Sequence, residues 1–281
     1  MENVTKKYKD KTAVCNVTAT MRSGQLIGLV GKNGAGKTTL LKLLCTIQKP
    51  ESGRILLDGR DIVKNPDIMR CAAGYLPQEV CAYPNLTVFE YVSYIAAVKG
   101  IRKKEAEKQI NSLLAEFHLE HAKDKRMGEC SGGMKQRAGI ICALLGSPQI
   151  LIIDEPAAGL DPEERISVRN SLSRLSRERI VILSTHIVSD IEAAASRIML
   201  LQKGRLVFYD SPQKLIAQAQ GCVWEYTLDS LQEHRPGISS MIQTEHGIRI
   251  RQVSREKPEK HAAAVKSTLE DACLFVMERC L

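Results

Sequence analysis

Two short segments combine residue types that bind phosphate and activate water. The first, Gly31 to Thr38, reads Gly-Lys-Asn-Gly-Ala-Gly-Lys-Thr and fits the pattern G-x-x-x-x-G-K-[ST]. Its glycines let the backbone curl so that successive N–H groups point at phosphate oxygens, and a following helix adds the positive end of its dipole. Lys37 can reach the β- and γ-phosphates, and Thr38 offers a hydroxyl to Mg²⁺.

The second segment ends an apolar run, Ile150 to Ile153, in the two carboxylates Asp154 and Glu155. An acid at the carboxyl end of a buried strand lies at the sheet edge where α/β proteins bind ligands. We expect Asp154 to support Mg²⁺, directly or through water. Glu155, one residue further on, is placed to orient an attacking water molecule and accept its proton.

A third segment, Cys130 to Arg137, reads Cys-Ser-Gly-Gly-Met-Lys-Gln-Arg. Ser131 and two bare glycine backbones that open a helix form a second phosphate-binding surface. The segment resembles the signature sequence of ATP-binding cassette (ABC) ATPases. It departs from that family at Cys130, where the family usually has Leu; the exchange removes apolar packing behind the loop but keeps the residues that face the phosphate.

The resemblance implies roles for four further residues. Tyr8 resembles the aromatic residue that stacks on adenine, and Gln78 the glutamine that senses Mg²⁺ and the attacking water. His186 resembles the histidine that contacts the γ-phosphate. Asp161, in Gly-Leu-Asp, resembles the loop that crosses to a partner subunit; it also precedes Pro162 as a helix N-cap, whatever else it does.

The sequence therefore predicts an ATP and Mg²⁺ site with three groups of residues. The expected catalytic residues are Glu155, His186 and Gln78. The expected nucleotide-binding residues are Tyr8, Gly31, Asn33, Gly34, Ala35, Gly36, Lys37, Thr38, Thr39, Ser131, Gly132, Gly133 and Asp161. The expected metal-binding residues are Thr38, Gln78 and Asp154.

Strands and helices of a parallel α/β fold must position these segments. An apolar strand over residues 25–30 precedes the first loop, and an apolar helix over residues 37–47 follows it. Continuous apolar strands at 150–153 and 180–183 flank a helix at 163–177. Strand, helix and strand in this order imply parallel pairing through a right-handed crossover.

The resemblance covers about residues 1–215 and implies an α/β fold of the P-loop NTPase (RecA-like) type. In that fold the core sheet is joined by an N-terminal antiparallel β subdomain and by an inserted helical subdomain at about residues 85–145. Residues 216–281 are expected to form a small C-terminal α+β accessory domain after a linker near residues 211–220.

The accessory domain is outlined by three patterns. Residues 222–228 and 247–253 alternate between apolar and polar like strands, and a helical pattern runs from about residue 261 to the end. Residues 267–275 resemble the closing segment of ATPases from bacterial drug, antibiotic and lantibiotic export systems.

Composition bounds the class of protein. The 281 residues carry 40 Lys and Arg against 32 Asp and Glu, a net charge of +8, and 44% are hydrophobic, which indicates a globular chain. The sequence shows neither the ~18 successive apolar residues of a membrane span nor a signal-peptide pattern. Its nine cysteines lack C-x-x-C spacing, so we expect reduced thiols.

The resemblance implies the ATP-binding and ATP-hydrolysing subunit of an ABC exporter. Such a subunit works as a head-to-tail dimer with a separate transmembrane permease, whose coupling helix is expected near residues 78–85. It lies in the cytoplasm, at the membrane face through the permease. No nucleic-acid partner is expected, because the basic residues are scattered along the chain.

Two alternatives remain open from the sequence. One is a soluble ABC ATPase that acts on nucleic acid or ribosomes, although the chain has one cassette and no sustained heptads; salt-dependent binding to nucleic acid would favour it. The other is a switch that binds ATP without useful turnover, which the presence of Glu155 and His186 argues against.

Overall fold

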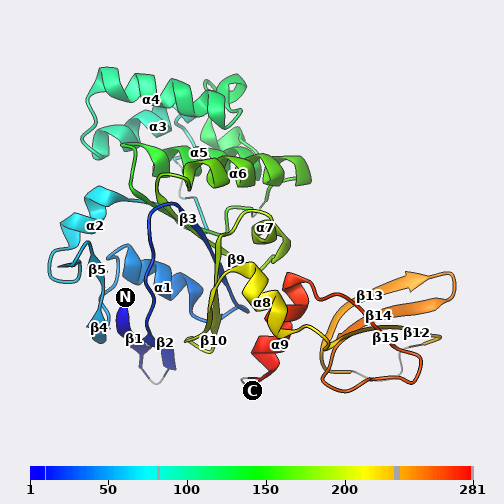
Figure 1. Ribbon diagram of the computed structural model, residues 1–281. Helices are drawn as coiled ribbons and strands as arrows, with labels where there is room; N and C mark the ends of the chain where they lie inside the picture. The colour runs from blue at the N-terminus through cyan, green and yellow to red at the C-terminus, as the bar shows by residue number, and fades with distance from the viewer. Residues whose placement is uncertain (10, 81–82, 158, 231–234, 280–281) are drawn as a thin grey trace.

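A six-stranded sheet forms the centre of the molecule (Figure 1). The computed structural model describes residues 1–9, 11–80, 83–157, 159–230 and 235–279. The strand order is β11-β10-β3-β9-β8-β7, parallel except for the antiparallel edge strand β11. The strands are β3 (Gln25–Val30), β7 (Ala73–Leu76), β8 (Ile150–Asp154), β9 (Ile180–Thr185), β10 (Arg197–Gln202) and β11 (Arg205–Asp210).

Both faces of this sheet are buried, which explains its continuously apolar strands. Successive side chains of β3 point to opposite faces: Leu26 belongs to one apolar cluster and Ile27 to the other. Helix α1 (Lys37–Leu44) covers the face of Ile27, whereas α5 (Gly132–Leu144) and α6 (Pro162–Leu175) cover the face of Leu26. Strands β8 and β9 pair in parallel, as predicted.

A small antiparallel sheet at the N-terminus has the order β2-β1-β4. It consists of β1 (Glu2–Tyr8), β2 (Lys11–Val17) and β4 (Ser52–Arg54). A short hairpin of β5 (Leu56–Leu57) and β6 (Arg60–Asp61) and the helix α2 (Pro66–Ala72) follow before the chain enters β7.

Helices occupy most of the segment between β7 and β8. They are α3 (Val88–Val98), α4 (Lys103–Glu116), two 3₁₀ turns at Glu120–Ala122 and Met127–Glu129, and α5. Thr87 starts α3 with a capping box, in which its side chain accepts from the Glu90 amide and Glu90 accepts from the Thr87 amide. The helical stretch predicted at about residues 85–145 is therefore present.

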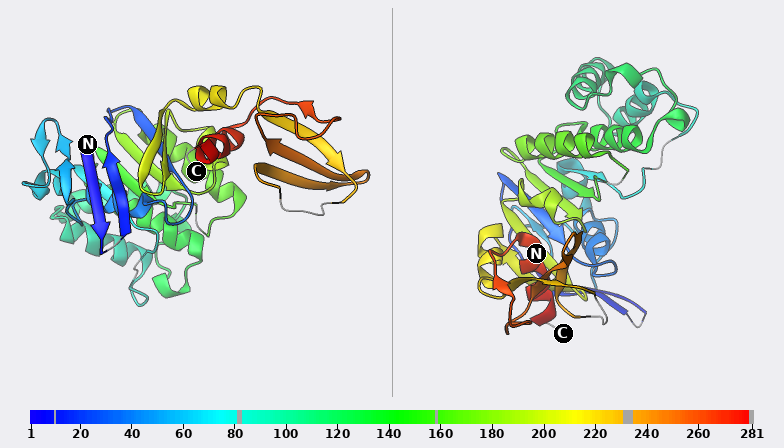
Figure 2. Two further views of the ribbon diagram at one scale, coloured as in Figure 1. Left: turned by 90° about the horizontal axis from the view of Figure 1, so that it is seen from below. Right: turned by 90° about the vertical axis from the view of Figure 1, so that its right-hand side faces the viewer.

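The C-terminal residues form a four-stranded antiparallel sheet that projects from the core, and two helices that lie against the core (Figures 1 and 2). The strand order is β13-β14-β12-β15. The elements are α8 (Pro212–Gln218), β12 (Val223–Leu228), β13 (Ile238–Thr244), β14 (Gly247–Val253), β15 (Ala263–Ala264) and α9 (Leu269–Arg279).

Three sequence predictions about element bounds are wrong. The expected linker at 211–220 is the helix α8, because Ser211 caps it and Leu215 is buried. The C-terminal helix begins at Leu269 rather than near residue 261, since Ala263–Ala264 pair with β12. Helix α1 ends at Leu44, three residues early, and Thr46 has a φ of 56° that no helix tolerates.

Two predictions from composition concern membrane-spanning segments and the state of the cysteines. Within the described ranges, no helix is long and apolar enough to cross a membrane. The described cysteines are free thiols: Cys15, Cys45, Cys71, Cys130, Cys142, Cys222 and Cys273.

Candidate active site

A cavity of 460 Å³ lies at the carboxyl ends of the parallel strands β3, β8 and β9. Most of the residues that the sequence predicted for the site line it together. The lining residues are Tyr8, Lys11, Ala13, Asn33, Gly34, Ala35, Gly36, Lys37, Thr38, Thr39, Gln78, Asp154, Glu155 and His186. They come from segments far apart in the sequence, because parallel strands bring their carboxyl ends to one edge of a sheet.

The glycine-rich loop is pressed against neighbouring backbone. Gly36 has a φ of 106°, and a Cβ atom at this position would lie 2.2 Å from the carbonyl oxygen of Ala13. A Cβ atom on Gly31 would lie 2.5 Å from the carbonyl oxygen of Leu201. Neither position can hold a side chain, so the two glycines fix the path of the loop over β3.

Helix α1 leaves its N-terminal amides available to an anion. Gly36 stands at its N-cap, the helix has no side-chain cap, and no acidic residue occupies its first turn. Unsatisfied N–H groups and the positive helix end therefore face the cavity beside Thr38 and Thr39. This arrangement suits the phosphates of a nucleotide.

Lys37 is held over the loop although it is only 7% exposed. Its Nζ atom donates a hydrogen bond of 2.7 Å to the carbonyl oxygen of Gly31. A buried ammonium group with one donated bond keeps further donors for a phosphate oxygen.

Asp154 is a buried carboxylate that is only partly satisfied. The residue is only 1% exposed, and its Oδ1 atom accepts a hydrogen bond from the hydroxyl of Ser184. Its Oδ2 atom is buried and has no hydrogen-bond partner among the described residues. Because such an orphaned oxygen is costly, the geometry fits a cation ligand here, with Thr38 and Gln78 on the same cavity.

The charge of Asp154 affects two neighbouring groups. Burial and then the negative charge of Asp154 raise the pKa of the Cys45 thiol to about 12. The same two causes raise the pKa of the Tyr75 hydroxyl. The region behind the cavity thus disfavours further negative charge, which a bound Mg²⁺ would offset.

Glu155 and His186 form a hydrogen-bonded pair at the cavity. The Nδ1 atom of His186 lies 2.9 Å from Oε2 of Glu155. Glu155 has a φ of 53°, a strained value for a non-glycine residue, and its amide donates to both the carbonyl oxygen and the hydroxyl of Ser184. The hydrogen bonds to Ser184 hold the Glu155 backbone in this strained conformation. The hydrogen bond to His186 orients the Glu155 carboxylate.

Tyr8 stands at the outer edge of the cavity with 41% of its surface exposed. Its hydroxyl donates to the side chain of Gln48, and the Lys6 ammonium lies 5.6 Å from the ring centroid. The aromatic ring is thus held at its hydroxyl and contacted by a cation over one face, and its other face can stack on a planar base.

A second predicted group lies outside this cavity: Ser131, Gly132, Gly133 and Asp161. Ser131 caps α5 by accepting from the Met134 amide, and Asp161 caps α6 by accepting from the Glu164 amide at 2.8 Å.

The two caps meet. A Cβ atom on Gly132 would lie 3.7 Å from the carbonyl oxygen of Gly159, and one on Gly133 would lie 2.3 Å from Oε2 of Glu164. The starts of α5 and α6 therefore form one separate surface.

Three residues that support the site were not predicted from the sequence. Ser184 holds Asp154, and the buried Gln136 donates from Nε2 to the carbonyl oxygen of Glu155 at 3.3 Å. Lys11 brings a positive charge to the cavity from β2. Ser184 directly precedes Thr185-His186, and Lys11 stands three positions after Tyr8; these positions were the available signals.

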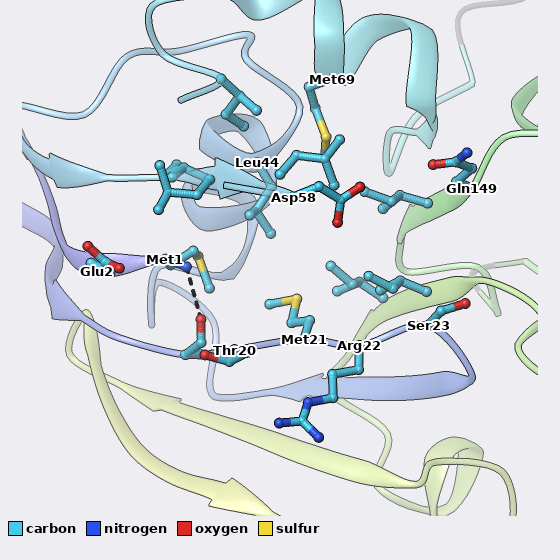
Figure 3. A pocket seen from close by; sticks show the side chains of 18 of the residues that line it. Met1, Glu2, Thr20, Met21, Arg22, Ser23, Leu44, Asp58, Met69 and Gln149 are labelled. Carbon is cyan, nitrogen blue, oxygen red and sulfur yellow. Dashed lines mark hydrogen bonds between the residues drawn. The ribbon is translucent and has the colours of Figure 1, made fainter. Parts of the chain in front are cut away.

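A larger cavity of 730 Å³ lies at the opposite ends of the same strands (Figure 3). Its floor is formed by buried aliphatic and thioether side chains, including Leu44 and Met69, and its rim by Arg22 and Asp58. It contains neither the glycine-rich loop nor the Asp154–Glu155 pair, so it is separate from the chemistry described above.

The chain is similar in sequence to known proteins. The family model described as ABC transporter matches residues 14–158. The ABC transporter ATP-binding protein YxlF of Bacillus subtilis is 34% identical over 246 residues, which cover 86% of this chain and 82% of that protein. Nod factor export ATP-binding protein I of Paraburkholderia xenovorans is 35% identical over 222 residues, which cover 79% and 73%.

Solved structures match as well. The structure of an ATP-binding subunit of an ABC transporter has a TM-score of 0.70 at 29% identity and covers 77% of this chain and 91% of its own. A dimeric post-hydrolysis state of the cassette MJ0796, bound to ADP and Pi, has a TM-score of 0.69 at 26% identity and covers 75% and 97%.

Proposed function

This chain belongs to the ABC transporter family and is an ATP-binding, ATP-hydrolysing subunit, and we propose that it drives export through a separately encoded membrane subunit by ATP-dependent closure of a dimer. Residues 1–215 would form the ATPase domain and residues 216–281 an accessory domain. The protein would lie in the cytoplasm, at the membrane face, through its permease.

One observation supports the proposed dimer most directly. The cavity of Lys37 and Asp154 and the surface of Ser131 are both suited to a nucleotide, yet Ser131 does not line that cavity. A head-to-tail dimer would place the Ser131 surface of one subunit on the nucleotide held by the other. The matched cassette MJ0796 is described as dimeric.

Each group at the cavity then has a role that its chemistry supports. Bound Mg²⁺ would neutralise phosphate charge, held by Thr38, Gln78 and the orphaned Oδ2 of Asp154. Lys37 and the amides of the loop would bind the phosphates. Glu155 would orient the attacking water and take its proton, while His186 would contact the γ-phosphate and fix the Glu155 carboxylate.

An exposed aromatic pair supports a protein partner near the helical subdomain. Tyr83 and Tyr94 are 52% and 45% exposed and stack edge to face with their centroids 5.5 Å apart. Exposed tyrosines are typical of protein interfaces. The coupling helix of a permease was predicted near residues 78–85, a segment whose residues 81 and 82 lie outside the described part of the chain.

Complementation between two inactive variants tests the shared site. In a mixture of Lys37→Ala and Ser131→Arg chains, a mixed dimer contains one doubly damaged site and one intact site. Some phosphate release should return on mixing, unless turnover requires both sites. Mixed dimers verified by differential tagging that bind ATP at neither site would overturn the proposal.

A further inference from the structure

The C-terminal helix α9 belongs to the main core of the protein. Its residues Leu269 and Cys273 are buried in the same apolar cluster as Ile198 of β10 and Ile191 of α7 (Ser189–Glu192). Gln202 of β10 also donates to the carbonyl oxygen of Met277 at 2.7 Å. Figures 1 and 2 show α9 lying against the core while the C-terminal sheet projects outward.

Helix α9 is also fixed to the projecting sheet. Asp271 is fully buried and accepts from Arg251 of β14 at 2.7 and 3.0 Å, from Ser239 of β13 at 2.6 Å, and from Thr268 at 2.8 Å. Although burial by itself raises its pKa, these hydrogen bonds outweigh that effect and leave the pKa of Asp271 lowered. The carboxylate is thus charged and locks α9 to two strands.

The short helix α7 lies between the nucleotide-site strand β3 and α9. On one side, a Cβ atom on Gly28 of β3 would lie 2.7 Å from Cδ1 of Ile191, so Ile191 packs directly on the β3 backbone. On the other side, the amide of Leu269, the first residue of α9, donates to Oε1 of Glu192 at 3.4 Å. Helix α7 therefore contacts β3 through Ile191 and α9 through the exposed Glu192.

The chain links α7 directly to His186. The amide of Asp190 donates to the carbonyl oxygen of Ile187, the residue after His186, and the Ile187 amide donates to the Thr185 hydroxyl. A cavity of 340 Å³ lies between the nucleotide-site loops and the C-terminal region. Asn33 and His186 line it from the nucleotide site, and Ser239, Glu270 and Cys273 line it from the C-terminal region.

We propose that the C-terminal region acts as a brace for His186, and that Glu192 is the positioning residue through which α9 holds α7 and the histidine segment in place. The inference rests on the proposed role of His186 in ATP hydrolysis. It gives the accessory domain a function inside its own subunit, without contact between that domain and the nucleotide.

The experiment compares steady-state phosphate release by Glu192→Ala and Glu192→Gln, with Glu107→Ala on the exposed face of α4 as the matched control. Loss of the brace should lower kcat about 3- to 10-fold and leave KM for ATP nearly unchanged, because the phosphate loop is intact. Glutamine keeps a side-chain oxygen that accepts from the Leu269 amide, so Glu192→Gln should retain most of the rate. The control should match the wild type.

A double-mutant cycle separates the brace from a general loss of structure. If Glu192 acts through His186, adding Glu192→Ala to His186→Ala should cause no further fall in kcat. Independent, additive losses would overturn the brace. Asp271→Ala, which removes the side-chain hydrogen bonds between α9 and the sheet, should lower kcat in the same way, and Glu192→Ala decides the matter if that variant fails to fold.

Different results would contradict the brace through Glu192 and the proposed role of His186 in ATP hydrolysis. If His186→Ala lowers kcat but Glu192→Ala does not, the brace is wrong and the proposed function stands. If His186→Ala itself keeps wild-type kcat, the proposed role of His186 is wrong.

Discussion

Nδ1 of His186 and Oε2 of Glu155 lie 2.9 Å apart, although 31 positions separate the two residues in the sequence. Each follows a buried parallel strand, and the pairing of Asp154 with Ser184 sets the two strand ends level. The pair gives the carboxylate a fixed direction while 59% of the histidine side chain stays exposed at the cavity. The hydrogen bond thus connects Glu155, the candidate general base, to His186, the residue expected to contact the γ-phosphate.

Glu155→Gln should separate ATP binding from hydrolysis. The amide keeps the shape of the side chain but cannot accept a proton, so turnover should fall about 10²-fold or more while ATP still binds. Dimers should accumulate with ATP, which light scattering would detect beside an assay of phosphate release. Turnover at the wild-type rate would remove Glu155 from its proposed role.

Lys37→Ala should weaken ATP binding with little effect on folding. The variant loses a charge-assisted contact worth about 1.5–3 kcal/mol, which corresponds to roughly tenfold or more in affinity. In the protein itself it loses only the bond to Gly31, about 1 kcal/mol. Calorimetric titration and thermal unfolding measure the two effects; Lys32→Ala, in the same loop, is the control, and unchanged affinity for Lys37→Ala would contradict the assignment.

Ser184→Ala tests whether the carboxylates depend on their neighbour. The variant removes the hydroxyl that donates to Asp154 and accepts from the Glu155 amide. We expect a loss of about 1–3 kcal/mol in unfolding free energy, because the buried Oδ1 of Asp154 is left unpaired, whereas the Glu155 amide keeps the main-chain carbonyl of residue 184. Turnover should fall as well, with a higher Mg²⁺ requirement. Ser112→Ala, on the exposed face of α4, should change neither; a Mg²⁺ titration like that of the wild type would count against the role of Ser184.

Asp271→Asn should show a pH-dependent loss of stability in the C-terminal sheet. Because the pKa of Asp271 is lowered in the folded protein, its stabilising effect is present above the unfolded value of about 3.9 and disappears as pH falls through the folded pKa. Breaking the buried pair with Arg251 should cost about 3 kcal/mol at pH 6. The difference from the wild type should shrink as the pH falls below about 4.

The single tryptophan makes this measurable. Trp224 lies in β12 of the affected sheet and donates from its indole to Ser254. Urea unfolding followed by its fluorescence at pH 6 and pH 3 gives the two free energies. Equal losses at both pH values would show that the charge of Asp271 contributes nothing.

Short-range chemistry in the sequence determined much of the candidate site. The pattern from Gly31 to Thr38 predicted a loop between a strand and a helix, and the structure has β3 and α1 there. Asp161 before Pro162 predicted the start of a helix, and α6 starts at Pro162 with a capping box. Such features depend on residues a few positions apart, so the sequence alone specifies them.

Tertiary structure decided what depends on distant packing. The sequence predicted that β8 and β9 pair in parallel, but it predicted neither that β3 lies on the other side of β9 nor the register that sets Ser184 beside Asp154. Both follow from burial of the two sheet faces rather than from local propensity. The segment predicted as a linker forms α8, because Leu215 packs in the main apolar core. The separation of Ser131 from Lys37, and the contact of α9 with α7, likewise come from packing across the whole chain, which no local pattern records.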